Sequence, residues 1–582
     1  MAHVSRLLLI CDAARRLGLR PVLLAAWHRA LPARVSARWR LRDRPVPGGP
    51  FLSMAAPPPA PPLPPAHVSA LLGRAARIAP GDWHGTFAPN APALTLDLFA
   101  PGDVRPVWER NRWAELALLA QSARIDPGGG HLARAEAFLV HWLRANPPFR
   151  GPNWACGQEA ALRALHLALA LALLGGPATL MRGGRDLLAL HARRIAATPA
   201  YALAQDNNHP VSEAAGLLIC GLLLAEPGWV RRGAARLDRA VTRLVAPCGA
   251  FAQASTGYHR LLLDVLSVAA WLRQRLGGPP MEETAAARAA AAAHWLSRVT
   301  DPATGALPRV GHQDGSAFAD LSLAGPDDAR GSLERAARLL AGRSAGFSAD
   351  PGCAWLNLPG PGSGPWPAEP RWSSEGFAGW RAGGARALLR TGPLRFRPGQ
   401  ADLLHLDLWD GSLALLRDGG TGAYNPPPGL AWWHAYFTGT AAHNTVAFDG
   451  ADQMPRAGRF LFARWPRCGR LPDGAWILDH RGNRHARSLR AEGRRWTVED
   501  RLSGPFRAVA LRWRLAPAAW RATADGAEGP GARLRLSADA PLTVTLEEGW
   551  ESPAYRVVRL APVLLARATA PVSRITTEIL LD

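Results

Sequence analysis

The spacing of apolar residues changes at the stretch 359–370, which reads Pro-Gly-Pro-Gly-Ser-Gly-Pro-Trp-Pro-Ala-Glu-Pro. Before this stretch, apolar residues recur every three or four positions, which is the period of an amphipathic helix. After it, they alternate in short runs between Gly, Asp and Asn turns, which is the period of a strand. The two periods demand different packing. We therefore predict an α+β protein of two domains, a helical domain followed by an antiparallel β-sandwich.

The helical half consists of apolar segments separated by short Gly/Pro breaks. Helices are expected at 113–122, 132–145, 157–174, 187–197, 211–224, 230–245, 258–276 and 281–299. Many successive antiparallel helices favour an incomplete α/α toroid. Strands are expected at 387–391, 403–409, 412–417, 445–449, 476–480, 496–501, 508–515, 533–537 and 542–547. The predicted domains are a helical and Pro-rich lead segment 1–65, the toroid 66–358, a linker 359–372 and the β-sandwich 373–582.

The composition restricts the class of protein. The chain is 48% hydrophobic and 20% charged, which is typical of globular domains. Its formal charge is +22, yet every basic residue is Arg and these are scattered, so we expect no nucleic-acid partner and regard an acidic polymer as compatible. The apolar runs are too short to cross a bilayer, and the six Cys are far apart. We expect no transmembrane segment or disulfide frame, and the compartment, periplasmic or cytoplasmic, stays open.

The segment 205–213, Gln-Asp-Asn-Asn-His-Pro-Val-Ser-Glu, precedes a long apolar helix. Pro210 suits the first turn of that helix, because its missing N–H would be unpaired there anyway. Asn208 and His209 then lie at the helix mouth, where free N–H groups and the dipole favour an anion. Together with Asn207 and Glu213, they indicate a place suited to a carboxylate. An ordinary Asn cap with a solvated His fits the same pattern.

Three further segments concentrate polar residues at expected helix starts. The loop 250–260 carries Gln253 and delivers Tyr258, His259 and Arg260, and a phenol beside positive charge can exchange a proton. The segments 107–113 and 153–159 carry Arg112, Asn153 and Trp154. These residue types suit sugar stacking and carboxylate recognition, although Glu/Arg pairs at helix starts are more often structural.

Three residues in the β half are candidates for chemistry. In Ala401-Asp-Leu-Leu-His-Leu-Asp-Leu-Trp409, alternation places His405 and Asp407 on one face of an expected strand. Asp418 and His443 follow in two later motifs. They suit either metal ligation or the polar side of a cleft.

Six motifs in order resemble the heparinase II/III family of polysaccharide lyases. They are Trp-Glu-x-x-Arg from Trp108, Asn-Asn-His with Glu213 and Gly216, Gln-x-x-x-x-Tyr-His-Arg from Gln253, Leu-His-Leu-Asp-Leu-Trp from Leu404, Arg-Asp-Gly-Gly-Thr from Arg417, and Ala-Ala-His-Asn-Thr-Val from Ala441. The resemblance implies a helical toroid packed on a β-sandwich, with substrate in the cleft between them. It also implies that the chain cleaves a uronic-acid polysaccharide by β-elimination. This polysaccharide would be the acidic partner that the charge allows.

The resemblance assigns a role to each candidate. Asn208 and His209 would neutralise the uronate carboxylate. Tyr258 would serve as base, acid or both, with His405 from the β domain as partner base. The residues implied to orient the substrate or the groups around it are Arg112, Asn153, Trp154, Asn207, Glu213, Gln253, His259 and Arg260.

The chain departs from the family at one segment. Many relatives carry His-x-His-x-Asp before the β-domain strand, where this chain has Pro398-Gly-Gln-Ala-Asp402. Asp418 and His443 resemble two zinc ligands of some relatives, but Gln400 matches the third position poorly. We therefore expect the elimination to require no cofactor, and a structural Zn²⁺ in the β domain stays an open alternative. Two other functions stay open: a glycan-binding or envelope-assembly protein without catalysis, and a toroid glycoside hydrolase.

Overall fold

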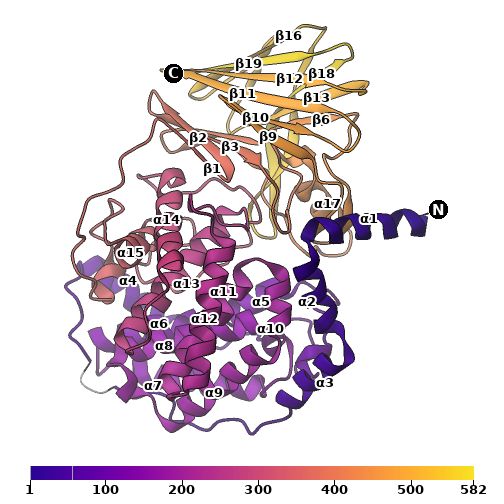
Figure 1. Ribbon diagram of the computed structural model, residues 1–582. Helices are drawn as coiled ribbons and strands as arrows, with labels where there is room; N and C mark the ends of the chain where they lie inside the picture. The colour runs from indigo at the N-terminus through magenta and orange to yellow at the C-terminus, as the bar shows by residue number, and fades with distance from the viewer. Residues whose placement is uncertain (1, 55–56) are drawn as a thin grey trace.

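The computed structural model describes residues 2–54 and 57–582, with side chains from residue 7 onward. Residues 1, 55 and 56 of the predicted lead segment lie outside the described residues. Helices come first along the chain and antiparallel sheets follow, stacked one above the other (Figure 1). The predicted fold class, a helical toroid domain followed by an antiparallel β-sandwich, is confirmed.

Helices α1 to α16 form the first part of the chain, and α17 lies within the β domain. Their bounds are α1 (Ala2–Leu17), α2 (Leu19–Arg29), α3 (Leu31–Arg40), α4 (Pro65–Ala76), α5 (Val104–Arg110), α6 (Ala114–Ile125), α7 (His131–Ala145), α8 (Gly157–Leu174), α9 (Arg182–Ala197), α10 (Pro199–Gln205), α11 (Asn208–Leu224), α12 (Pro227–Leu244), α13 (Thr256–Arg275), α14 (Glu283–Val299), α15 (Arg330–Ala341), α16 (Pro351–Trp355) and α17 (Trp432–Thr438).

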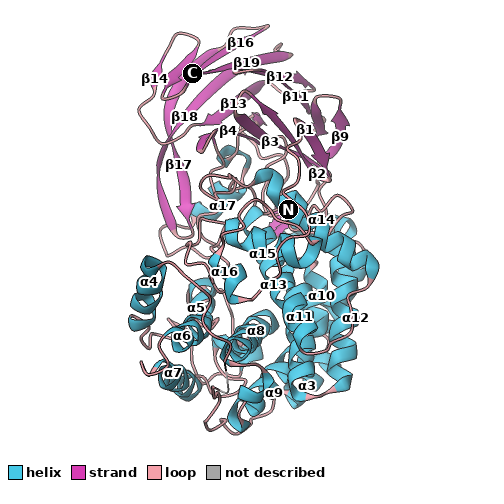
Figure 2. Ribbon diagram, turned by 90° about the vertical axis from the view of Figure 1, so that its left-hand side faces the viewer, coloured by secondary structure: helices cyan, strands magenta, loops and turns pink. Residues whose placement is uncertain are grey.

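The helices pack in two layers. Helices α6, α8, α11, α13 and α15 contact one another in succession and form an inner arc, while α7, α9, α12 and α14 pack outside as their chain neighbours (Figure 2). Of the inner helices, α8 and α11 are apolar nearly all round, as helices covered on every side must be. Helix α8 alone among the described helices is long and apolar enough to cross a membrane, and 94% of it is buried in this core.

The β domain contains strands β1 to β19. Their bounds are β1 (Arg371–Ser374), β2 (Gly376–Ala382), β3 (Ala385–Gly392), β4 (Leu406–Asp410), β5 (Leu413–Leu416), β6 (Val446–Phe448), β7 (Arg456–Gly458), β8 (Leu461–Phe462), β9 (Arg467–Leu471), β10 (Gly474–Leu478), β11 (Arg484–Glu492), β12 (Arg495–Ser503), β13 (Ala508–Arg514), β14 (Arg521–Ala522), β15 (Gly526–Gly529), β16 (Ala532–Ala538), β17 (Thr543–Ala554), β18 (Val557–Thr569) and β19 (Arg574–Leu581).

Three of the sheets build the sandwich. One layer is the eight-stranded sheet β14-β15-β16-β19-β12-β11-β10-β9. The other combines β1-β2-β3-β4-β5 with β17-β18-β13-β6, and these two meet at a bridge between Leu416 and Leu515. Alternating apolar residues from both layers, such as Leu408, Trp496 and Trp513, form the core between them.

Polar contacts hold the two domains together around the site. The backbone N–H of Gln313 donates to Thr421 Oγ1 over 2.7 Å, and the Tyr555 hydroxyl donates to Asp103 Oδ2 over 2.6 Å. Trp295 Nε1 donates to Ser374 Oγ over 3.0 Å. The loops that carry these residues therefore keep a defined position relative to the helix starts beneath the sandwich.

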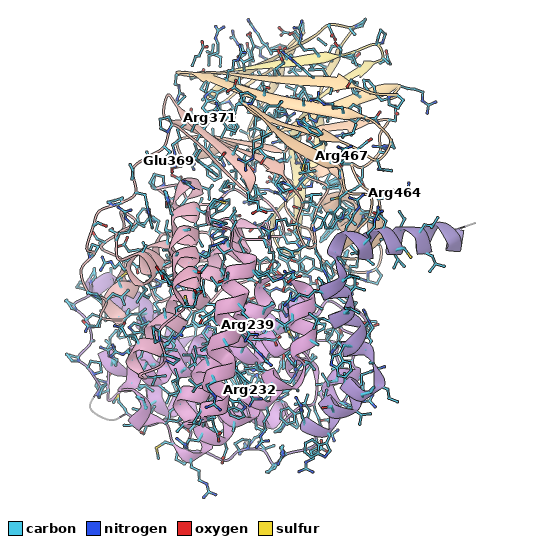
Figure 3. All side chains as sticks on the ribbon, in the orientation of Figure 1. Arg232, Arg239, Glu369, Arg371, Arg464 and Arg467 are labelled. Carbon is cyan, nitrogen blue, oxygen red and sulfur yellow. The ribbon has the colours of Figure 1, made fainter. Side chains whose placement is uncertain are left out.

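The arginines are distributed over both domains. Figure 3 labels Arg232 and Arg239 on the helical domain and Arg464 and Arg467 on the β domain. This distribution agrees with the scatter seen in the sequence.

Candidate active site

A cleft lies where the helix starts of the toroid face the loops of the β domain. Its cavity volume is about 220 Å³. Of the residues predicted for the site, five line it: Arg112, Asn207, His209, Gln253 and Tyr258. They come from three separate parts of the chain, so the helical packing brings together the segments that the sequence singles out.

The mouth of α11 forms one wall. The helix begins at Asn208, and Asn207 caps it by accepting from the N–H of His209 over 3.0 Å. Asn208 is buried behind this wall. Its amide donates to Gln158 Oε1 over 2.7 Å and its backbone N–H to Gln253 Oε1 over 3.2 Å. Gln158 and Gln253 line the cleft themselves, so Asn208 holds two cleft residues in place.

His209 and Glu213 form an i,i+4 pair on α11, with 4.0 Å between His209 Nδ1 and Glu213 Oε1. Burial lowers the pKa of His209 to about 4, so the ring is neutral at pH 7. Burial also raises the pKa of Glu213 to about 8, against the opposing effect of Arg194 and Arg236. Glu213 does not line the cleft, and its buried carboxyl group is protonated at pH 7.

Tyr258 belongs to a buried polar cluster. Its hydroxyl donates to Asp314 Oδ2 over 2.5 Å, Arg105 Nε lies 2.9 Å from the same oxygen, and the Tyr424 hydroxyl donates to it over 3.1 Å. Burial and the Asp314 carboxylate raise the pKa of Tyr258 well above its usual range. Burial also acts to raise the pKa of Asp314, but Arg105 outweighs it and holds that pKa far below the usual range. The phenol is therefore protonated and the carboxylate charged.

His312 lines the same cleft from the loop before Asp314. The Ser255 hydroxyl donates to the carbonyl of His312 over 2.6 Å and accepts from the N–H of Tyr258 over 3.1 Å, so one serine positions both residues. The imidazole lies against Gly399, where an added Cβ would come within 2.7 Å of the ring. Burial lowers the pKa of His312, while Asp314 and the carbonyl of Gly399 oppose the shift.

One arginine of the cleft has no acidic partner. Arg105, Arg112, Arg390 and Arg395 pair with Asp314, Glu159, Asp402 and Glu375 respectively. Arg397 donates to the carbonyl of Ala204 over 3.3 Å and, within the described residues, has no carboxylate within ion-pair distance. That contact places Arg397 next to the residues that precede α11, and its charge adds to the burial that lowers the pKa of His209.

Besides Asn208 and Glu213, four more predicted residues of the helical domain do not line the cleft. Asn153 and Trp154 are buried, and their side chains donate to Asn146 over 2.7 and 3.2 Å. His259 stacks on Trp295 with its ring centroid 4.7 Å away. Arg260 turns outward and donates to Ser332 Oγ over 3.0 Å. These side chains support the helix starts from behind.

His405 does not reach the cleft either. The strand predicted at 403–409 begins only at Leu406, because the chain turns at Leu404 with φ 62° and the N–H of His405 donates to the carbonyl of Asp402. His405 is fully buried within the β domain. It lies on the same side as Asp407, with 2.8 Å between its Nε2 and Asp407 Oδ2, as the alternation predicted.

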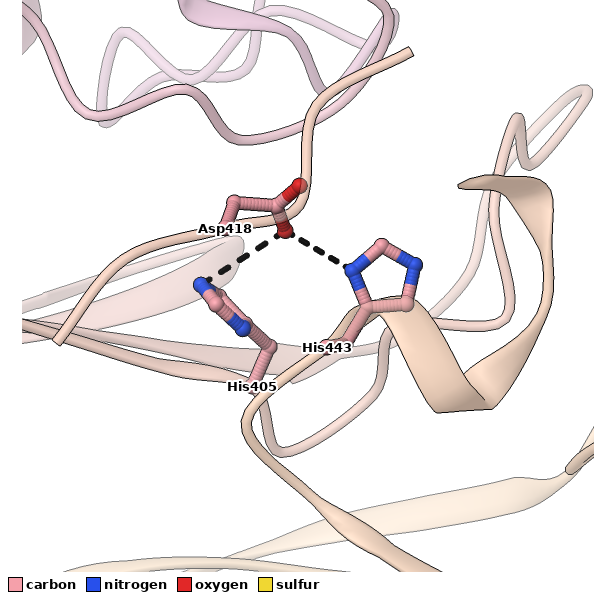
Figure 4. A group of neighbouring side chains, drawn as sticks. All are labelled: His405, Asp418 and His443. Carbon is pink, nitrogen blue, oxygen red and sulfur yellow. Dashed lines mark hydrogen bonds and ion pairs between the residues drawn. The ribbon is translucent and has the colours of Figure 1, made fainter. Parts of the chain in front are cut away.

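His405, Asp418 and His443 form a buried group (Figure 4). Asp418 Oδ2 lies 2.8 Å from His443 Nδ1 and 3.6 Å from His405 Nε2. Gln400 lies outside this group, and its amide donates to the carbonyls of Gly420 and Phe437.

One ligand atom from each of the three residues lies within 4.8 Å of the other two, close enough to share a metal ion, but the hydrogen bonds of His405 oppose this. The backbone N–H of Asn444 donates to His405 Nδ1 over 2.9 Å, so a neutral ring carries its proton on Nε2, where Asp407 accepts it. Nε2 then has no lone pair for a metal, which leaves two donors where structural zinc takes four. The hydrogen-bonded network leaves two buried atoms without a partner among the described residues, His443 Nε2 and Asp407 Oδ1.

Four cleft residues were not predicted from the sequence: Arg105, His312, Asp314 and Arg397. Asp314 and His312 lie in the segment Val310-Gly-His-Gln-Asp-Gly-Ser316, a polar stretch within a long region without periodicity. That composition predicts a loop, but it does not predict which other part of the protein the loop contacts. Tyr424 lies three residues after Thr421, which ends the Arg-Asp-Gly-Gly-Thr motif.

Comparison with known structures identifies the class of fold. Heparinase III aligns with a TM-score of 0.65 at 13% identity, over 97% of this chain and 92% of that one. Heparan sulfate lyase HepC from Pedobacter heparinus aligns with a TM-score of 0.56 at 16% identity, over 96% and 88%. Chondroitin AC lyase from Streptomyces coelicolor aligns with a TM-score of 0.54 at 13% identity, over 95% and 83%. The fold is that of two-domain polysaccharide lyases.

The resemblance to a known family rests on the β domain. Residues 368–578 match the model of the heparinase II/III-like C-terminal domain. The resemblance to the heparinase II/III family is thereby confirmed. A search of curated proteins finds no match.

Proposed function

We propose that this protein is a polysaccharide lyase that cleaves a uronate-containing acidic polysaccharide by β-elimination. One observation carries the proposal: an unpaired guanidinium, a neutral imidazole and a protonated phenol line a single cleft, on Arg397, His312 and Tyr258. These are the three kinds of group that such an elimination needs. The fold shared with heparinase III and chondroitin AC lyase supports the same class of reaction.

The substrate carboxylate binds at the mouth of α11. The guanidinium of Arg397 is not paired with a described carboxylate there, and His209 and Asn207 offer polar groups on the adjoining wall. Neutralising the carboxylate makes the C5 hydrogen more acidic, because negative charge then spreads into the carboxylate as the proton leaves. The direct role predicted for Asn208 stays a prediction, since its amide is engaged with Gln158.

His312 acts as the base that takes the C5 proton. It replaces His405 in this role, because His405 is buried away from the cleft. Its lowered pKa keeps the ring neutral, hence basic, at pH 7. It also lies against Gly399, in the segment where many relatives carry the β-domain His.

Tyr258 acts as the acid that protonates O4. A phenol with a raised pKa keeps its proton until an oxygen with developing negative charge approaches. Asp314 and Arg105 orient this hydroxyl. As the C5–H bond breaks, its electrons form the C4=C5 double bond, the C4–O4 bond breaks, and O4 receives the Tyr258 proton.

The reaction requires no metal. The groups assigned to proton transfer belong to the cleft, whereas the His405–Asp418–His443 network is buried outside it. We assign that network to the stability of the β domain.

A glycoside hydrolase needs two carboxyl groups free to act on the scissile bond. Each acidic residue of the cleft already has a partner: Asp314, Glu159, Asp402 and Asp206 pair with arginines, and Asp103 accepts from Tyr555. This arrangement disfavours hydrolysis.

The test uses a panel of uronate polymers and follows the ultraviolet absorbance of the unsaturated product. A rise with at least one polymer is expected. New reducing ends without the chromophore would instead indicate hydrolysis. Binding without either signal would indicate a glycan-binding protein.

A further inference from the structure

Helices α2 and α3 carry an exposed apolar stripe. Its members recur every fourth residue and are Leu19, Leu23, Trp27, Leu31, Val35 and Trp39. Each exposes between 56% and 80% of its surface. A spacing of four keeps residues on one helix face, so each helix turns three large apolar side chains outward.

The stripe is held in place by the opposite faces of the same helices. Helix α2 packs on α10, where Pro21 is buried and the ring centroids of His28 and Tyr201 lie 5.1 Å apart. Arg20 Nη1 lies 3.2 Å from Asp206 Oδ1. Helix α3 packs on α9 and buries Ala37. Both helices lie along one edge of the helical domain (Figure 1). The apolar face of α2 and α3 therefore points outward, because their opposite faces pack on the helical domain.

Arginines flank the stripe. Residues 7–44 contain nine Arg against two Asp. Arg29, Arg34 and Arg38 make no ion pair with a described residue, and their side chains are exposed. Exposed Leu and Trp beside unpaired Arg are the pattern of a helix that lies in the interface of an anionic membrane, with Trp at headgroup level and Arg near the phosphates.

We propose that α2 and α3 dock this protein on an anionic lipid surface. Charge complementarity favours lipid over a second copy of the chain, because two stripes facing each other would bring two arginine sets together. The docked cleft would lie close to the bilayer, since Asp206 both pairs with Arg20 and lines the cleft.

The experiment is co-sedimentation of the full chain with phosphatidylglycerol/phosphatidylcholine vesicles and with pure phosphatidylcholine vesicles. Because the chain has a net charge of +22, charge alone produces some attraction, so the decisive variant keeps every charge. This variant is Leu19→Gln/Leu23→Gln/Trp27→Gln. A loss of about tenfold or more in partitioning to the anionic vesicles is expected.

The matched control is Val557→Gln/Leu560→Gln, two exposed apolar residues on β18, which should bind as the parent does. Circular dichroism and the thermal midpoint check folding, which exposed substitutions should leave intact. A second variant, Arg29→Gln/Arg34→Gln/Arg38→Gln, should bind less and show a weaker salt dependence than the parent.

Three outcomes would overturn the proposal. In the first, the parent chain stays in the supernatant with anionic vesicles. In the second, the Leu19→Gln/Leu23→Gln/Trp27→Gln variant binds these vesicles as well as the parent does. In the third, the parent binds no lipid, light scattering shows that it is a dimer, and the Leu19→Gln/Leu23→Gln/Trp27→Gln variant is a monomer. That result would assign the stripe to contact with a second copy of the chain. None of these depends on lyase activity.

Discussion

The Tyr258 hydroxyl donates to Asp314 Oδ2 over 2.5 Å, while the same carboxylate oxygen pairs with Arg105. The charge of Arg105 keeps Asp314 ionised, and burial together with the ionised carboxylate keeps the phenol protonated. This relationship favours an acid role for Tyr258 over a phenolate base.

Tyr258→Phe should lower kcat by about 10²- to 10⁴-fold, because it removes the proton donor and leaves the ring in place. Substrate binding and the thermal midpoint should stay close to those of the parent. Tyr424→Phe, which also loses a bond to Asp314, is the matched control and should cost far less activity. A Tyr258→Phe protein with near-parental turnover would remove Tyr258 from the mechanism.

His312→Asn and His405→Asn should fail in different ways. His312→Asn should lose kcat with an unchanged thermal midpoint, because the ring contacts the cleft. His405→Asn should lose stability by about 1–3 kcal/mol, because buried partners are left unpaired. Measured kcat and melting curves for both variants check this. Equal loss of kcat at equal stability would restore His405 as the base.

The pH profile of kcat/KM should be a broad plateau. The base must be neutral, and its pKa lies below the ordinary 6.5, so the acid limb falls below pH 6.5. The acid must be protonated, and its pKa lies above the ordinary 10, so the alkaline limb falls above pH 10. An acid limb above pH 7 would contradict the assignment of His312.

Arg397→Gln should raise KM by roughly 10- to 100-fold, the effect of one charge-assisted hydrogen bond. Arg395→Gln is the control, because that residue also borders the cleft but pairs with Glu375. Initial rates on the uronate polymer identified by the panel measure both. Equal KM for the two variants would show that Arg397 does not bind the carboxylate.

Chelation should leave the protein unchanged. After dialysis against EDTA, the thermal midpoint and activity should match the untreated protein, because His405 Nε2 has no lone pair to bind zinc. Elemental analysis should find less than stoichiometric zinc. One zinc per chain, released together with a lower midpoint, would contradict the hydrogen-bonded network.

Glu213→Gln should stabilise the fold at pH 9 and change little at pH 5. The folded-state pKa of about 8 exceeds the ordinary 4.5, so the folded protein keeps a proton that the unfolded chain releases. Stability due to this group is present below pH 4.5 and declines as pH rises through 8, by a few kcal/mol at most. Melting curves of both proteins at the two pH values test this. A shift of equal size at both would contradict a buried proton on Glu213.

The sequence was sufficient to predict the two domains and most of the helices. The apolar period is a local property, so α8 was predicted with its observed bounds and α13 to within two residues at its start. The mouth of α11 and the loop to Tyr258 were also recognisable, because capping and turn chemistry depend on near neighbours.

Only the tertiary structure decided which polar residues meet. His312 and Asp314 lie in an irregular loop whose path is set by contacts with Ser255 and Thr421, residues 57 and 108 positions away from their partners. His405 has the right residue type and strand alternation, yet a turn at Leu404 sends it into the sandwich. Periodicity records which face of an element is apolar. It holds no information on how a loop from one domain settles against another, because that depends on packing between residues distant in the chain.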